Sequence, residues 1–206
     1  MDTGLRLMIY DRTCTGPWGR PGLSHSWWLG AHFYRVTTRF DATCGVANWS
    51  EALDWLARFR PEHSISEIQF WGHGKWGQAN VCGEILGIEA LDPKHPLHEK
   101  MRALRPRLSE HSLWWFRTCE TFGANAGRSF AQAWTQWWRC RAAGHTYIIG
   151  PIQSGLHGLS PGERPLWPAD EGLLEGTAAS PTKARHSSFR APHTITCLHS
   201  RVPRDY

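Results

Sequence analysis

The sequence lacks the features that mark membrane proteins, zinc ribbons and exported proteins. It has no apolar stretch of about 18 residues, so neither a membrane span nor a membrane partner is expected. The apolar run within residues 1–12 is too short for an export signal, which predicts a cytoplasmic protein with reduced thiols. No two cysteines form a C-x-x-C pair or fit the spacing of a zinc finger, so no metal is predicted. The six cysteines are Cys14, Cys44, Cys82, Cys119, Cys140 and Cys197.

Lysine and net charge are also scarce. Only four of the 23 basic residues are lysines, and the net charge is +5. Residues 180–206 hold five basic residues and one acidic residue, so the basic character belongs mainly to the C-terminal tail. This charge is modest and no nucleic-acid-binding motif accompanies it, so no nucleic-acid partner is predicted. The sequence indicates no particular oligomeric state.

The chain is long enough for one α/β domain with an appended segment. It has 206 residues, of which 41% are hydrophobic. Short apolar runs alternate with amphipathic segments, which is typical of a mainly parallel sheet flanked by helices. Asn48, three residues before Glu51, predicts the start of one helix. The predicted strands are residues 5–10, 27–36, 65–71, 112–118 and 145–150, and the predicted helices are residues 49–60, 97–104 and 130–141.

The C-terminal quarter differs in composition. Residues 158–192 are rich in proline, glycine and serine, which predicts an extended loop. Residues 193–198 predict one last edge strand. We therefore expect a domain over residues 1–157 and a C-terminal extension over residues 158–206.

Two predicted strands end in side chains suited to covalent catalysis. One is followed by His73, which stands between Gly72 and Gly74, and the other by Cys119. The carboxyl ends of neighbouring parallel strands meet at one edge of a sheet, where ligands commonly bind. An imidazole beside a thiol can take its proton and later protonate a leaving amine. The backbone amides of Gly74 and Cys119 are the candidate donors to an oxyanion.

These two segments resemble the catalytic blocks of a known peptidase family. IQFWGHGKWG (68–77) resembles the His-Gly block of caspase-like cysteine peptidases (clan CD). RTCETFGANAGRSFAQAW (117–134) resembles their cysteine block, especially the C-E-T-G type of CHAT-family members, although Phe122 stands where that pattern has glycine. The resemblance implies a three-layer caspase-like sandwich and a cysteine endopeptidase that needs no cofactor. It implies Cys119 as nucleophile and His73 as acid and base.

The resemblance also implies where substrate would bind. In several relatives the S1 pocket is lined from the end of the first strand and from two residues before the nucleophile. Here these positions are Arg12, or Asp11, and Arg117. Two guanidiniums would suit an acidic P1 side chain, whereas an Asp11–Arg117 pair would neutralise the pocket. Trp76 flanks the site and would line a substrate subsite or pack locally. The implied partner is a protein substrate, such as a linked effector protein.

Plainer interpretations stand beside this one. Cysteine is among the most buried residue types, so Cys119 alone would be a small core residue. His73 alone would be a turn residue, and Glu120 either orients the dyad or is a solvated carboxylate. The alternative function is therefore a non-enzymatic protein-interaction domain on the same fold.

Overall fold

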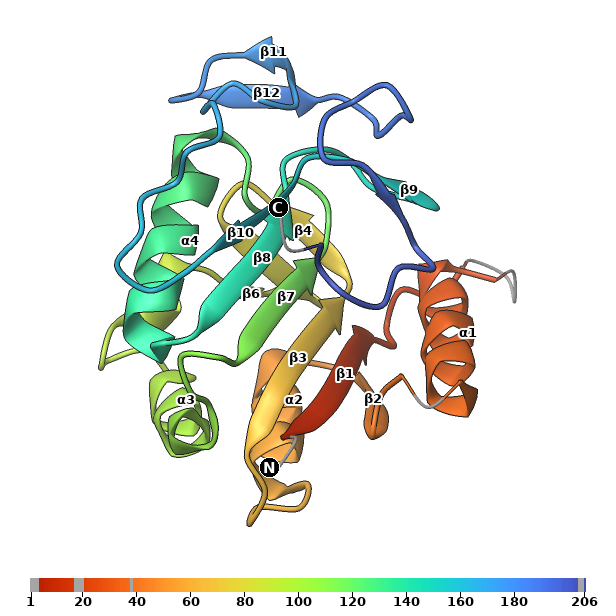
Figure 1. Ribbon diagram of the computed structural model, residues 1–206, viewed down its shortest axis with the longest axis vertical. Helices are drawn as coiled ribbons and strands as arrows, with labels where there is room; N and C mark the ends of the chain where they lie inside the picture. The colour runs from red at the N-terminus through yellow and green to blue at the C-terminus, as the bar shows by residue number, and fades with distance from the viewer. Residues whose placement is uncertain (1–3, 17–20, 38, 204–205) are drawn as a thin grey trace.

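A six-stranded sheet forms the centre of the protein. The computed structural model describes residues 4–16, 21–37, 39–203 and 206. The strand order is β10-β8-β7-β3-β1-β2; β10 runs antiparallel to its neighbour and the other five strands are parallel (Figure 1). The predicted α/β class with a mainly parallel sheet is confirmed. The strands are β1 (Leu5–Asp11), β2 (Ala42–Val46), β3 (Ile65–Trp71), β7 (Leu113–Arg117), β8 (Arg141–His145) and β10 (Leu156–Leu159).

Helices lie on both faces of this sheet. Alternate residues of β1 point to opposite faces, so Leu7 and Ile9 join the main core while Met8 joins a second, smaller cluster. The main core also takes in α2, α3 and α4, and the smaller cluster takes in α1. These helices are α1 (Leu23–Val36), α2 (Trp49–Arg58), α3 (His98–Leu104) and α4 (Ala124–Trp138). Short 3₁₀ turns, η2 (Ile88–Leu91) and η3 (Arg105–Arg107), flank α3.

Three small sheets lie near the carboxyl edge of the central sheet. β4 (His73–Lys75), β5 (Gln78–Val81) and β6 (Glu84–Leu86) form an antiparallel sheet directly after β3. The C-terminal extension supplies the other two sheets. β11 (Leu173–Gly176) pairs with β12 (Pro181–Ala184), and β13 (Ile195–Thr196) pairs with β9 (Ile152–Gln153).

Most predicted elements are confirmed, because each has a clear local signal. The strands predicted at 5–10, 65–71 and 112–118 correspond to β1, β3 and β7. The side chain of Asn48 accepts a hydrogen bond from the Glu51 amide at 2.7 Å and caps α2, as its spacing predicts. The other two predicted helices correspond to α3 and α4.

The strand predicted at 27–36 is wrong, because these residues belong to α1. The segment is apolar on every side, so periodicity does not distinguish a helix from a strand. Its buried residues Ala31 and Tyr34 face Trp71 and Phe40, with the Tyr34 and Trp71 rings 5.6 Å apart. The outer face keeps several large apolar side chains exposed: Leu23, Trp28, Leu29, Phe33 and Val36.

The strand predicted at 145–150 is wrong in its position along the chain, because the strand of this region, β8, lies before it. Helix α4 ends early because Arg139 adopts a left-handed conformation (φ 52°), and β8 then begins at Arg141. Gly144 lies within β8. A Cβ there would stand 2.5 Å from the Phe122 ring, so the close packing requires glycine. The edge strand predicted at 193–198 is confirmed only as β13, which pairs with β9 and not with the central sheet.

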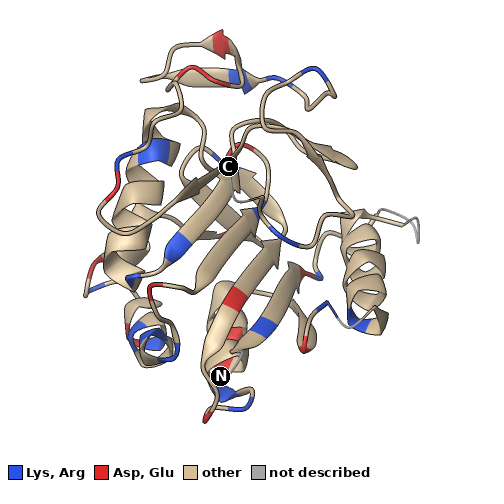
Figure 2. Cartoon of the chain, viewed as in Figure 1, with Lys and Arg blue, Asp and Glu red and all other residues tan. Residues whose placement is uncertain are grey.

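Charged residues are dispersed over the fold. Basic and acidic residues are scattered over the visible elements, and this view shows no face of one sign (Figure 2). Among the described residues, none of the helices combines the length and the apolar character needed to cross a membrane.

Candidate functional site

The sheet register brings His73 and Cys119 to the same edge. β3 and β7 are parallel neighbours, and Trp71 at the end of one pairs with Arg117 at the end of the other. His73 and Cys119 each follow this pair by two residues. Both therefore leave the carboxyl edge of the sheet side by side, which is the arrangement that the sequence predicts.

Close packing at Gly74 joins the two segments. A Cβ at Gly74 would lie 2.3 Å from Thr121 Oγ1, 2.7 Å from Thr118 Cβ and 2.8 Å from the carbonyl oxygen of Cys119. Only glycine lets the backbone after β3 approach the backbone after β7 this closely. The two candidate oxyanion amides, those of Gly74 and Cys119, belong to these touching segments.

One cavity of about 600 Å³ contains both candidate catalytic residues. His73 and Cys119 line it together with Arg117 and parts of α1, such as Trp27. The loop 149–153 and two residues of the C-terminal extension, Cys197 and Leu198, complete the wall. His73 is exposed, whereas Cys119 is partly buried. A thiol and an imidazole thus share one solvent-accessible space.

The Cys119 thiol is held by the loop after β8. The amide of Ile149 donates to Cys119 Sγ at 3.4 Å, and the Ile149 carbonyl lies 3.8 Å from the same sulfur. Burial raises the pKa of Cys119, the Ile149 amide lowers it in part, and the carboxylate of Glu120 raises it further. The net pKa is raised, so the resting group is a thiol that needs a base.

His73 makes its hydrogen bond to a different cysteine. Its Nε2 lies 3.4 Å from Cys14 Sγ in the loop after β1, and the edge of Trp27 packs against its ring with centroids 5.4 Å apart. This contact engages Nε2, and no hydrogen bond joins His73 to Cys119 among the described residues. The sequence gives no signal for Cys14, because 59 residues separate it from His73.

Arg117 lines the cavity, but other groups of the protein already accept hydrogen bonds from all of its N–H donors. It is 2% exposed and lies between the rings of Trp71 and Trp115, each 4.5 Å from its guanidinium carbon. Its Nε and Nη2 donate to Gln153 Oε1 at 3.1 and 2.6 Å. The remaining N–H groups bond to Tyr34 and to backbone carbonyls of the C-terminal extension, namely those of Thr196, Cys197 and His199.

The other predicted substrate-binding residues do not line this cavity. Arg12 pairs with Glu51 at 3.2 Å and faces solvent. Asp11 accepts hydrogen bonds from the backbone and hydroxyl of Thr13, so it neither pairs with Arg117 nor neutralises the pocket. Trp76 stacks under the Lys75 ammonium, 4.9 Å from its ring centre. Of the set, only Arg117 accompanies the dyad.

Glu120 provides a test of the electrostatics at Cys119. This carboxylate is buried, and burial raises its own pKa, while Lys75 and His186 lower it in part. Its negative charge disfavours the Cys119 thiolate. We expect Glu120→Gln to lower the pKa of Cys119, so that iodoacetamide labels Cys119 several times faster at pH 7.5. The rate of Cys119 labelling against pH, read by peptide mass spectrometry, measures this. Glu110→Gln, at an exposed position, is the control, and an unchanged pH profile for Glu120→Gln would contradict the assignment.

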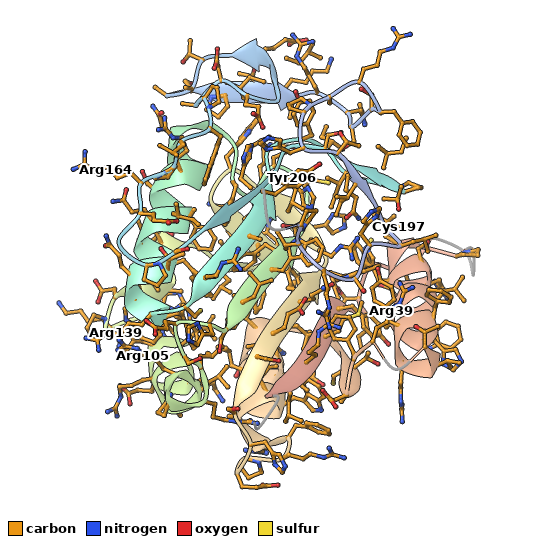
Figure 3. The ribbon with its side chains drawn as sticks, viewed as in Figure 1. Arg39, Arg105, Arg139, Arg164, Cys197 and Tyr206 are labelled. Carbon is orange, nitrogen blue, oxygen red and sulfur yellow. The ribbon has the colours of Figure 1, made fainter. Side chains whose placement is uncertain are left out.

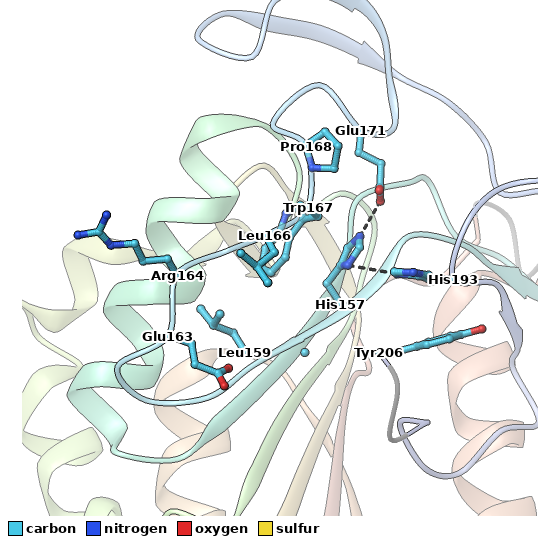
Figure 4. A pocket seen from close by; sticks show the side chains of 11 residues that line it. His157, Leu159, Glu163, Arg164, Leu166, Trp167, Pro168, Glu171, His193 and Tyr206 are labelled. Carbon is cyan, nitrogen blue, oxygen red and sulfur yellow. Dashed lines mark hydrogen bonds and ion pairs between the residues drawn. The ribbon is translucent and has the colours of Figure 1, made fainter.

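A second cavity of about 590 Å³, under the C-terminal extension, was not predicted (Figure 4). His157 Nε2 contacts Glu171 Oε1 at 2.7 Å, and His157 Nδ1 lies 3.3 Å from His193 Nδ1. Burial raises the pKa of Glu171, but hydrogen bonds from His157 and Thr146 outweigh it and the net pKa is lowered. The ring of Trp167 stacks on His157. None of the described residues that line this cavity is a cysteine, serine or threonine.

A metal centre is not supported within the described ranges, which contain no group of three or more His, Cys, Asp or Glu side chains able to hold an ion.

Comparison with known proteins adds no assignment: the chain matches no family model, and no curated protein is significantly similar to it. Function must therefore be inferred from the residues and their geometry.

Proposed function

We propose that the protein is a caspase-like cysteine endopeptidase that uses Cys119 and His73. The observation that carries the proposal is that parallel neighbours β3 and β7 deliver an imidazole and a thiol into one cavity. Other features support it. The sheet has helices on both faces and β10 antiparallel at one edge, and Gly74 packs on the nucleophile segment.

The proposed reaction uses the groups already in place. His73 takes the proton of Cys119, and the sulfur attacks the carbonyl carbon of a peptide bond. Amides of Gly74 and Cys119 stabilise the oxyanion. The C–N bond then breaks, His73 returns the proton to the leaving amine, and a thioester remains on Cys119. A water molecule, deprotonated by His73, hydrolyses the thioester and restores the thiol.

Acidic P1 specificity would depend on Arg117. All of its N–H groups are engaged by Gln153, Tyr34 and the carbonyls of residues 196–199. A substrate carboxylate would therefore reach the guanidinium only after these carbonyls move away. Arg12 cannot assist, because it pairs with Glu51 outside the cavity.

The second candidate function is a non-enzymatic protein-interaction domain. The observation that favours it is the exposed apolar surface of α1 outside the cavity, where Trp28 and Val36 are 54% and 67% exposed. Such a face is typical of a contact surface. It does not explain why a thiol and an imidazole share a cavity on the inner side of the same helix.

Covalent trapping separates the two candidates. A short peptide ending in an acyloxymethyl ketone should alkylate Cys119 in preference to the other five cysteines, since the proposed reaction makes Cys119 the nucleophile in the cavity that it shares with His73. Peptide mass spectrometry locates the adduct. His73→Ala should slow trapping at Cys119, whereas His63→Ala, at an unrelated surface position, should not. Equal labelling of all six thiols, unchanged by His73→Ala, would overturn the proposed endopeptidase.

A further inference from the structure

The C-terminal extension lies along the loop that borders the candidate site. Ile195 and Thr196 pair antiparallel with Gln153 and Ile152, and further backbone hydrogen bonds join the residues on either side of these pairs. The amide of Gly155 donates to the Pro192 carbonyl at 2.9 Å, the amide of Leu156 donates to the His193 carbonyl at 3.1 Å, and the amide of Cys197 donates to the Pro151 carbonyl at 2.8 Å. This is the way in which an extended peptide adds a strand to an exposed edge.

The next residues of the segment are held by their backbone carbonyls. Arg117 donates to the carbonyls of Cys197 (3.2 Å) and His199 (2.9 Å), and the Tyr34 hydroxyl also donates to both. Arg39 donates to the Leu198 carbonyl at 2.7 Å; Figure 3 shows Arg39 and Cys197 beside α1. These three side chains therefore bind main-chain carbonyls of the segment, and any extended peptide could present such carbonyls.

The direction of the segment matches that of a substrate approaching the thiol. Antiparallel pairing carries the chain from Ile195, opposite Gln153, to Cys197, opposite Pro151. The same loop continues to Ile149, whose amide contacts Cys119 Sγ. The segment thus advances toward the nucleophile, and Cys197 and Leu198 line the cavity with His73 and Cys119.

Side-chain burial is confined to one end of the segment. Ile195 is 3% exposed and packs with Trp115 and Leu156, whereas Leu198 is 60% exposed. The portion nearest the thiol is therefore held mainly through backbone hydrogen bonds. Exchange of the segment for another peptide would therefore cost its backbone hydrogen bonds and the packing of Ile195.

We propose that residues Ile195–Ser200 occupy the peptide groove of the protein and keep it latent until they are displaced. The inference rests on the proposed endopeptidase function. The substrate is then an extended polypeptide that pairs with β9 and offers its carbonyls to Arg117, as the segment does now. A tethered occupant has an effective concentration of about millimolar, so release requires that its own contacts weaken.

Two substitutions at Cys197 test this with a matched control. Cys197→Pro removes the amide that bonds to Pro151, whereas Cys197→Ser keeps it. We expect iodoacetamide to label Cys119 at least about tenfold faster in Cys197→Pro than in Cys197→Ser, because the open fraction of the groove rises. A peptide of residues 193–200 with serine at position 197, added at about 1 mM, should reverse the gain. The same peptide N-methylated at position 197 should not.

A substitution at Arg39 weakens the binding of residues 195–200 independently of Cys197. Arg39→Gln removes the donor to Leu198, and Arg35→Gln, at an exposed position in the last turn of α1, is its control. Hydrogen exchange at residues 195–199 reports release, and thermal unfolding confirms the fold. If the doubly substituted Cys197→Pro, Arg39→Gln protein exchanges these amides freely while Cys119 labelling stays at the parent rate, the latency proposal is overturned.

The outcomes separate this inference from the function beneath it. Faster labelling of Cys119 without hydrolysis of any peptide would support the occupied groove and overturn the endopeptidase function. Equal hydrolysis by the Cys197→Pro and Cys197→Ser proteins would support the endopeptidase function and overturn the latency.

Discussion

Peptide hydrolysis should fall by about 10⁶-fold when Cys119 is replaced by alanine, because the step that forms the thioester is lost altogether. His73→Ala should lower kcat by about 10²–10⁴-fold, since a raised thiol pKa leaves little thiolate without a base. Both are measured as initial rates with an extended fluorogenic peptide, in the Cys197→Pro background where the groove is open. Thermal unfolding of each variant checks that the fold is kept.

The pH profile adds a second readout for His73. In His73→Ala the residual rate should follow the Cys119 thiolate, whose pKa is raised by burial, so that activity keeps increasing into alkaline pH. His25→Ala on exposed α1 is the control. A profile identical to that of the parent would contradict a role for His73 in proton transfer.

Cys14 supplies the sharpest contrary outcome, because its sulfur is the one that touches His73. If Cys119 is the nucleophile, Cys14→Ser should keep the ring in place through its hydroxyl, and Cys14→Ala should cost less activity than His73→Ala. Should Cys14→Ala abolish hydrolysis while Cys119→Ala leaves it, the nucleophile is Cys14 and the site must be reassigned.

The placement of His73 and Cys119 at one edge of the sheet was predictable from the sequence, because it depends only on the order and direction of two strands. His73 and Cys119 each follow a strand with a strong apolar signal, and parallel neighbours deliver their carboxyl ends to one edge. The Arg117 position was also predicted. Its hydrogen-bond partners were not predicted, because those at residues 196–199 lie about 80 residues further along the chain.

The errors have a common physical origin. Residues 27–36 and 145–150 are mostly apolar and show neither clear helical periodicity nor alternation, so local pattern does not reveal which tertiary contacts they make. Tyr34 of α1 becomes buried only against Trp71, and the loop after β8 is ordered by Cys119 and by the extension. The same limit applies to Cys14 and to the His157–Glu171 pair, whose partners are distant in sequence.

Arg117→Met should be the most destabilising single substitution at the site, with a loss of about 3–5 kcal/mol in the free energy of unfolding. The guanidinium satisfies Gln153 and the carbonyls of three residues in an environment from which water is excluded. Methionine fills much of the volume but leaves these acceptors without donors. Arg117→Lys should not rescue stability, because three donors on one atom cannot reproduce a planar set of five.

Arg12→Met is the matched control for this loss. Arg12 also stands at the end of a strand and pairs with Glu51, but its side chain is 54% exposed, so its removal should cost at most about 1 kcal/mol. Chemical denaturation measures both. Because Arg117 joins the sheet to the segment over the thiol, its replacement should also speed hydrogen exchange at residues 195–199 and labelling of Cys119 below the unfolding transition. An Arg117→Met protein as stable as Arg12→Met, with that segment still protected, would show that the buried cation is not what holds the occupant in the groove.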